Sequence, residues 1–340
     1  MKDIHGGNIW RVSKEASKKP AEILDFSASI NPLGLPPKAA LAVKRSLRLV
    51  PPYPDPGSVD LREALSSFHG VRSDEVLPAN GSTQLIHLIP EVLRPKAALI
   101  VEPAFSEYRA SLKRSGCRAG GFLLRESEGF SLDLKRLERR LRKGCGLLYI
   151  ANPANPTGAL IEKEVMLSVA SLCAAYGTTL VVDEAFMDFA EAESIKREAA
   201  RLKGVIVLRS LTKFFSMAGL RLGYMISDRR LIKMFAEALP PWSINTLATV
   251  AAKAALKDKA YRRAIWRWLD AERPFLFNGL KGIPGLQPFP SGANFFLVKI
   301  TKPSVTAPLV KAVLLEEGIL IRELSAFPGL GRGYFRVAVR

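Results

Sequence analysis

The sequence lacks the features that would place it in a membrane, in a secretory pathway or among metal-binding proteins. None of its apolar runs reaches the roughly 18 residues needed to span a bilayer, and its first residues lack the apolar stretch of a signal peptide. Only three cysteines are present, Cys117, Cys145 and Cys173, and their wide spacing indicates neither a disulfide framework nor a zinc site. We therefore expect a cytoplasmic protein with reduced, buried thiols, no metal and no membrane contact.

A recognisable nucleic-acid-binding motif is also missing. The chain has 50 basic and 32 acidic residues, and its net charge of +18 could attract phosphates nonspecifically. The basic residues are spread along the chain, however, with short clusters such as those at residues 136–140 and 262–263. Solvated helix faces explain this pattern, and the charge favours capture of small phosphorylated anions. We predict no nucleic-acid partner, although a basic nucleic-acid-binding protein that has kept an enzyme fold is the alternative of a different class.

Short apolar runs alternate with longer helical patterns, which is typical of an α/β protein with crossover helices. The runs predicted to be strands are residues 97–101, 146–150, 179–183, 205–208 and 222–226. Helical patterns fill the gaps, including residues 84–93 and 162–176, and a basic helical stretch runs from Pro241 to about Gly282.

The length of 340 residues exceeds the usual size of a single core, so more than one domain is expected. We predict an N-terminal arm with part of a small domain at residues 1–45 and a large domain at residues 46–238. Residues 239–340 are predicted to form the remainder of the small domain, with strands at residues 294–298 and 319–322.

Three polar clusters follow predicted strands of the large domain. Residues 152–158 follow one strand, Asp183 ends the next, and residues 210–213 follow a third. Ligands in open α/β sheets bind beyond the carboxyl ends of the strands. Each cluster alone is explained by a turn or a helix cap, but their convergence predicts a ligand site on one rim of the sheet.

Lys213 is the candidate catalytic residue of that rim. It lies between hydroxyl side chains and precedes Arg221 by eight positions. A desolvated lysine amine, or one near other cations, can bond covalently to the aldehyde of pyridoxal phosphate, whereas a solvated lysine cannot do so readily at neutral pH. Ser210, Thr212 and Arg221 are suited to the cofactor's phosphate. In isolation, a solvated surface lysine is the competing interpretation.

The other residues that this cofactor requires are also present. Asp183 is suited to face the pyridine nitrogen, because an ionised carboxylate keeps that nitrogen protonated. Asn155 offers a neutral donor to the phenolate oxygen, and Phe105 is the candidate cover for the ring face. Gly81, Ser82 and Thr83 precede or begin a helical pattern, whose N-terminus would bind the phosphate.

The ordered set of these motifs resembles the fold-type I pyridoxal-phosphate enzymes over essentially the whole chain. The motifs are Asn80-Gly81 and residues 152–158, 183–186, 210–213 and 219–223. The sequence is similar in particular to the histidinol-phosphate aminotransferase branch. Within this branch, residues 5–8, 25–34 and 208–214 most resemble the threonine-phosphate decarboxylases of cobalamin biosynthesis. The resemblance implies a large domain with a mostly parallel seven-stranded sheet between helices, together with a smaller α/β domain from the two termini.

The resemblance also implies further site residues and a partner. It implies a homodimer with shared active sites, in which Tyr53 reaches the cofactor phosphate of the neighbouring subunit, and it places Arg336 on the substrate carboxylate. The substrate, a small phosphorylated amino acid, would also meet a second set of residues: His5, Gly6, Gly7, Asn8, Asn31, Asn155 and Arg322. Phe186 stands where many aminotransferases of this type have a tyrosine, which leaves Asn155 as the main donor to the phenolate.

The residues alone do not decide between two reactions. An aminotransferase breaks the Cα–H bond and a decarboxylase breaks the Cα–carboxylate bond, and the same residues serve both. The resemblance favours decarboxylation of O-phospho-L-threonine to (R)-1-aminopropan-2-yl phosphate and CO2. Histidinol-phosphate aminotransferase, a related phosphoamino-acid aminotransferase and phosphoserine decarboxylase are the alternatives.

Overall fold

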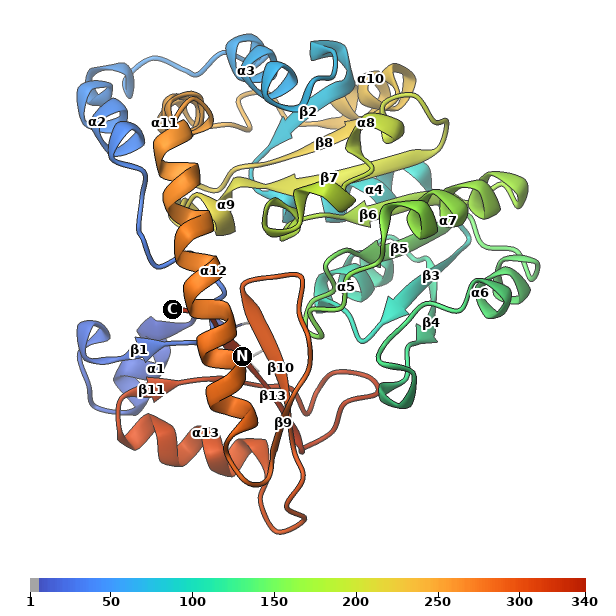
Figure 1. Ribbon diagram of the computed structural model, residues 1–340. Helices are drawn as coiled ribbons and strands as arrows, with labels where there is room; N and C mark the ends of the chain where they lie inside the picture. The colour runs from blue at the N-terminus through green and yellow to red at the C-terminus, as the bar shows by residue number, and fades with distance from the viewer. Residues whose placement is uncertain (1–5) are drawn as a thin grey trace.

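A computed structural model describes residues 6–340 of the protein (Figure 1). His5, predicted to meet the substrate, lies outside the described residues. Within residues 6–340, no helix is both long enough and apolar enough to cross a membrane. The same part of the chain has no group of three or more histidine, cysteine, aspartate or glutamate residues that could hold a metal ion.

A seven-stranded sheet forms the large unit, in the order β2-β8-β7-β6-β5-β3-β4. Its strands are β2 (Val76–Ala79), β3 (Ala97–Glu102), β4 (Arg118–Leu123), β5 (Leu147–Ala151), β6 (Thr179–Asp183), β7 (Val205–Ser210) and β8 (Gly223–Ser227). Only β8 runs antiparallel to its neighbours. The central strands are apolar on both faces because helices cover both faces of the sheet. The predicted fold class is therefore confirmed.

Two hydrophobic cores flank this sheet. The first face is covered by α4 (Ser82–Leu93), α5 (Ser106–Arg114) and α10 (Arg229–Ala238). The opposite face is covered by α3 (Val59–His69), α6 (Leu134–Leu141), α7 (Lys163–Ala175) and α8 (Lys196–Ala199), joined by α2 (Pro37–Arg45). Successive residues of β5 alternate between the two cores, as Leu147 and Leu148 do, because side chains of a strand point alternately to opposite faces.

The small unit is formed by both ends of the chain (Figure 1). Its four-stranded antiparallel sheet has the order β12-β13-β10-β9, from β9 (Leu286–Pro288), β10 (Phe295–Ile300), β12 (Arg322–Glu323) and β13 (Tyr334–Ala338). A separate two-stranded parallel sheet pairs β1 (Leu24–Asp25) with β11 (Ile319–Leu320), and α1 (Ile9–Glu15) and α13 (Ala307–Glu316) complete the unit. The prediction of one strand at residues 319–322 is wrong, because Ile321 separates two short strands that belong to different sheets.

The basic helical stretch beyond Pro241 consists of two helices. Asn245 caps α11 (Thr246–Leu256), and Asp258 caps α12 (Lys259–Lys281) by accepting from a backbone N–H of its first turn. Helix α11 packs beside α2 and α3, and α12 runs from there down to the small sheet (Figure 1). The domain limits at residues 45 and 238 stay predictions, since α11 and α12 join the two units.

A buried cluster of charges fixes the ends of β6 and β7 to each other. The guanidinium of Arg209, which is 0% exposed, donates to Glu184 at 2.9 Å, to Asp188 at 2.9 Å and to Glu191 at 2.6 Å. Glu184 directly follows the last residue of β6, and Arg209 is the penultimate residue of β7. The cluster therefore holds together the two strand ends that carry Asp183 and Ser210.

Arg209→Met is expected to destabilise the fold by about 3–5 kcal/mol, because the buried carboxylates of Glu184 and Asp188 lose the guanidinium with which they pair. The midpoint of urea-induced unfolding measures the loss. Arg201→Met is the matched control, since Arg201 is exposed and should change stability by no more than about 0.5 kcal/mol. Equal midpoints for the two variants would show that Arg209 does not hold the cluster together.

Candidate active site

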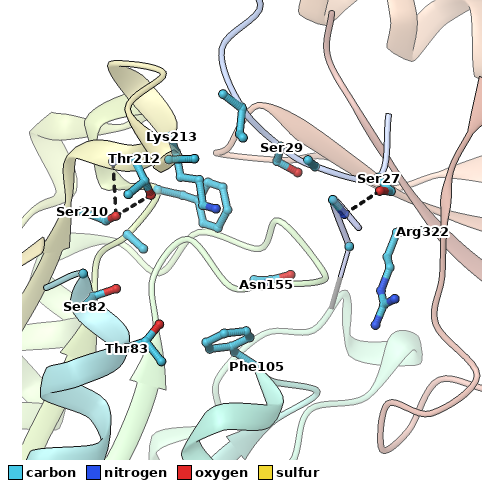
Figure 2. Close-up of a pocket in the computed structure, with 18 of the residues that line it drawn as sticks. Ser27, Ser29, Ser82, Thr83, Phe105, Asn155, Ser210, Thr212, Lys213 and Arg322 are labelled. Atoms are coloured by element: carbon cyan, nitrogen blue, oxygen red, sulfur yellow. Dashed lines mark hydrogen bonds between the residues drawn. The ribbon is translucent and has the colours of Figure 1, made fainter. Parts of the chain in front are cut away.

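A cavity of about 480 Å³ lies where the carboxyl ends of β5, β6 and β7 face the small sheet. Figure 2 shows Lys213, Ser210 and Thr212 on one side of this cavity, with Ser27 and Arg322 across from them. The register aligns the strand ends, since Ala151 pairs with Asp183 and Asp183 pairs with Leu208. The structure thus brings the three predicted polar clusters together on one rim.

Lys213 lies in a one-turn helix, α9 (Leu211–Phe214), that begins directly after β7. The Ser210 side chain caps this helix and exchanges a hydrogen bond of 2.7 Å with the hydroxyl of Thr212. The Lys213 amine lies 5.9 Å from the ring centre of Phe186. Burial, with added repulsion from Arg336 and Arg221, lowers the pKa of Lys213 to about 8. A much larger fraction of this amine than of a solvated lysine is therefore uncharged and nucleophilic near neutral pH.

The rate at which the cofactor-free protein takes up pyridoxal phosphate should depend on this pKa. Only the uncharged amine attacks an aldehyde, so the rate should fall almost tenfold for each pH unit below about 8 and level off above it. Stopped-flow absorbance between pH 6.5 and pH 8.5 measures the dependence. Inorganic phosphate binding over the same range is the control for titration of the cradle. A flat profile of cofactor uptake would contradict a Lys213 amine that titrates in this range.

The residues predicted to hold phosphate lie around the N-terminus of α4. Gly81 precedes this helix with a φ of 77°, and a Cβ there would lie 2.8 Å from the guanidinium of Arg221. Ser82 and Thr83 lie in the first turn of α4, which begins two residues before the predicted start at Gln84, and both line the cavity. Hydroxyls, a guanidinium and free N–H groups at a helix end fit a phosphate.

Asp183 is buried in the wall of the cavity, and Tyr108 holds it. The Tyr108 hydroxyl donates to one carboxylate oxygen at 2.7 Å, and the backbone N–H of Ala185 donates to the other at 3.0 Å. Burial raises the pKa of Asp183, while these two donors oppose that effect. Sequence reasoning missed Tyr108, although its position three residues after Phe105 places it one turn along α5.

Asn155 and Arg336 are bonded to each other. The Arg336 guanidinium donates to the side-chain oxygen of Asn155 at 2.5 Å, which leaves the Asn155 amide group available as a donor. Arg336 comes from the small unit and Asn155 from the large one, so this bond spans both. Phe105 and Phe186 also line the cavity, and Phe186 packs edge-on against Phe295 at 5.0 Å.

Two arginines of the small sheet stand directly opposite each other. Arg322 of β12 pairs with Arg336 of β13 in the antiparallel register, and the two residues are 8% and 7% exposed. Burial and the charge of Arg322 lower the pKa of Arg336 to about 9, so its guanidinium is still charged at neutral pH. Like charges opposite one another on neighbouring strands repel. An anion bound between them would relieve both the repulsion and the cost of burial.

Two residues predicted for this cavity, Asn31 and Asn8, do not line it, and neither does Tyr53, which the resemblance places at the site of a neighbouring subunit. Asn31 is buried, and its amide donates to the carbonyl of Phe214 and to the hydroxyl of Tyr261. Asn8 caps α1, and Tyr53 is 80% exposed on the surface. Gly6 and Gly7 do line the cavity, together with Arg322.

The residues present fit pyridoxal phosphate: a half-buried lysine amine of lowered pKa, a buried carboxylate, a phosphate cradle and an amide donor face one space. Such a site at the strand ends of an open α/β sheet defines the pyridoxal-phosphate enzymes of fold type I. Within them, the chain belongs to the Aminotransferase class I and II family, whose profile matches residues 21–339. The cofactor predicted from Lys213 and its neighbours is thereby confirmed.

Known relatives include both decarboxylases and aminotransferases. The threonine-phosphate decarboxylase of Salmonella typhimurium is 37% identical over 99% of this chain and 92% of its own. The crystal structure of L-threonine-O-3-phosphate decarboxylase from Porphyromonas gingivalis is similar with a TM-score of 0.81, at 27% identity over 93% of this chain and 94% of its own. The histidinol-phosphate aminotransferase from Clostridium acetobutylicum has a TM-score of 0.87, at 28% identity over 94% of both chains.

Proposed function

We propose that the protein decarboxylates O-phospho-L-threonine to (R)-1-aminopropan-2-yl phosphate and CO2, as a step of cobalamin biosynthesis. The observation that carries this proposal is the buried, cross-strand pair Arg322 and Arg336, which is suited to a substrate with two anionic groups. A carboxylate fits the fork of Arg336, and a phosphate fits Arg322 with the adjacent arm of Gly6 and Gly7. The 37% identity to a threonine-phosphate decarboxylase supports the same substrate.

The chain's residues have separate tasks in this reaction. When bound, pyridoxal phosphate supplies the electron sink for the bond broken at Cα of the substrate. The two arginines hold both ends of the substrate and so orient its carboxylate. Cleavage of the Cα–carboxylate bond releases CO2 and leaves its electron pair behind, and a proton must then be added at Cα. Lys213 is the residue that we assign to deliver this proton.

Mass spectrometry of the products from O-phospho-L-threonine, with and without 2-oxoglutarate, tests the proposal. We expect CO2 and the aminopropanyl phosphate without any oxo-acid acceptor. Turnover that depends strictly on an acceptor would instead support the aminotransferase function of the Clostridium acetobutylicum relative. O-phospho-L-serine should be compared in parallel, because a single methyl group discriminates by only about 1–3 kcal/mol.

We further propose a homodimer whose active sites are shared between subunits. Tyr53 stacks on Trp242 with 4.7 Å between ring centres, and Leu47, Val50 and Val59 are more than half exposed around the same segment. A second copy of the chain would cover this apolar surface, and Tyr53 would reach its cofactor phosphate.

Tyr53→Ala is expected to weaken cofactor binding, because it would remove a contact to the phosphate held by the other subunit. Light scattering should show a dimer for the wild-type protein, and Leu47→Asp should lower the molecular mass by opposing burial of the surface. Tyr176→Ala, remote from this surface, is the matched tyrosine control. A wild-type monomer that retains full activity would contradict the dimer proposal.

A further inference from the structure

The turn that follows β1 connects two parts of the cavity that bind different groups. One carboxylate oxygen of Asp25 accepts hydrogen bonds from the backbone N–H and the hydroxyl of Ser27, at 2.8 and 2.6 Å, and from the N–H of Ala28 at 3.3 Å. Asp25 and Ser27 are both buried and both line the cavity. These bonds fix the direction in which the hydroxyl and the carbonyl of Ser27 point.

The hydroxyl of Ser27 holds the N-terminal arm. It accepts a hydrogen bond of 2.9 Å from the backbone N–H of Gly7, as Figure 2 shows, and it donates a hydrogen bond to the carboxylate of Asp25. A hydroxyl has one donor and two acceptor positions, so both bonds can be made together. Ser27 is therefore the anchor of Gly7.

The carbonyl of Ser27 holds Arg336. It accepts from one guanidinium nitrogen at 2.6 Å, while the other nitrogen donates to Asn155 at 2.5 Å. Gly6 packs against this same carbonyl, since a Cβ on Gly6 would collide with its oxygen. The hydroxyl that binds the N-terminal arm and the carbonyl that orients Arg336 thus belong to one residue, Ser27.

We infer that Ser27 is a positioning residue that couples the N-terminal arm to Arg336, so that the contacts to the substrate's phosphate and to its carboxylate strengthen together. This inference rests on the proposed function for the assignment of the two anionic groups. It assigns to Asp25 the task of holding Ser27, and it requires glycine at position 6. A change at the arm should therefore weaken binding of a carboxylate that the arm itself does not touch.

Two ligands distinguish the contacts to the carboxylate from those to the phosphate. Both lack an amine, so they bind without reacting with the cofactor. 3-Hydroxybutanoate carries the carboxylate alone, and 3-phosphooxybutanoate carries both anionic groups. Calorimetric dissociation constants of both ligands are measured on the cofactor-loaded wild-type protein, Ser27→Ala and Gly6→Ala. Ser13→Ala is the matched control, since the Ser13 hydroxyl donates to the carbonyl of Trp10 within α1. Thermal unfolding of each variant identifies any loss of fold.

We expect Ser27→Ala and Gly6→Ala to raise the dissociation constants of both ligands by about three- to tenfold. This is the effect of losing one hydrogen bond between the protein and the ligand. Ser13→Ala should change neither constant by more than about twofold. Weakening of 3-phosphooxybutanoate alone, or of neither ligand, by the folded Ser27→Ala variant would overturn the coupling. Failure of the decarboxylation proposal is seen separately, in the products of the wild-type enzyme, and leaves the comparison with 3-hydroxybutanoate intact.

Discussion

Lys213→Ala is expected to lower turnover of O-phospho-L-threonine by about 10⁴-fold or more, since it removes both the covalent attachment of the cofactor and the proposed proton donor. Lys213 is the one side chain that we assign to both tasks, and its lowered pKa leaves more of the amine uncharged for attack on the aldehyde. CO2 release measures the turnover. The absorbance band of the lysine-bound cofactor should be lost in the same variant.

Lys203→Ala is the matched control, because Lys203 is an exposed residue of the loop that precedes β7. It should retain the wild-type rate and absorbance band. Lys213→Arg keeps a cation at the position but cannot form the bond to the aldehyde, so it should be as inactive as the alanine variant. Substantial turnover by either Lys213 variant would show that another residue attacks the cofactor.

The residues at the strand ends could be predicted from the sequence because their position depends only on the order of strands and helices along the chain. The chain alternates strands and helices, and in a parallel sheet the carboxyl ends of the strands meet on one side. Asp183 and Ser210 each end a strand, and Asn155 lies in the loop after another. The order of strands and polar side chains along the chain was therefore sufficient to predict that these side chains lie close together.

The part of the site that comes from the small unit was harder to predict, because it depends on strand register. Residues 319–321 are continuously apolar and run directly into Arg322, yet the chain changes sheet at Ile321. That change places Arg322 directly opposite Arg336. Periodicity shows which residues share a face of a strand, but it does not identify the partner residue on a strand far away in the sequence.

Side chains that support the site through another residue were missed for a related reason. Tyr108 bonds to Asp183 across 75 positions of the chain, and Ser27 bonds to Arg336 across 309. Asn31, predicted to meet the substrate, instead donates to the carbonyl of Phe214 beside Lys213. Its position in a glycine- and proline-rich arm gave no indication that the side chain would be used within the fold.

Asp183→Asn is expected to lower kcat by about 10²–10³-fold while the protein retains its cofactor. We propose that this carboxylate faces the ring nitrogen, and a neutral amide of the same shape cannot keep that nitrogen protonated. Tyr108→Phe is the matched variant, because it removes one hydrogen bond of 2.7 Å to Asp183 but leaves the charge in place. It should lower kcat by less than about tenfold.

Steady-state rates and the absorbance of bound cofactor, recorded on the same samples, separate an effect on chemistry from loss of the cofactor. The relative rates of the two variants decide whether the charge of Asp183 or its hydrogen bonds matter. If charge at Asp183 is what matters, then Asp183→Asn must be much slower than Tyr108→Phe at equal occupancy of the cofactor. Equal rates for the two variants would mean that Asp183 acts by its hydrogen bonds alone, and its assignment to the ring nitrogen would have to be withdrawn.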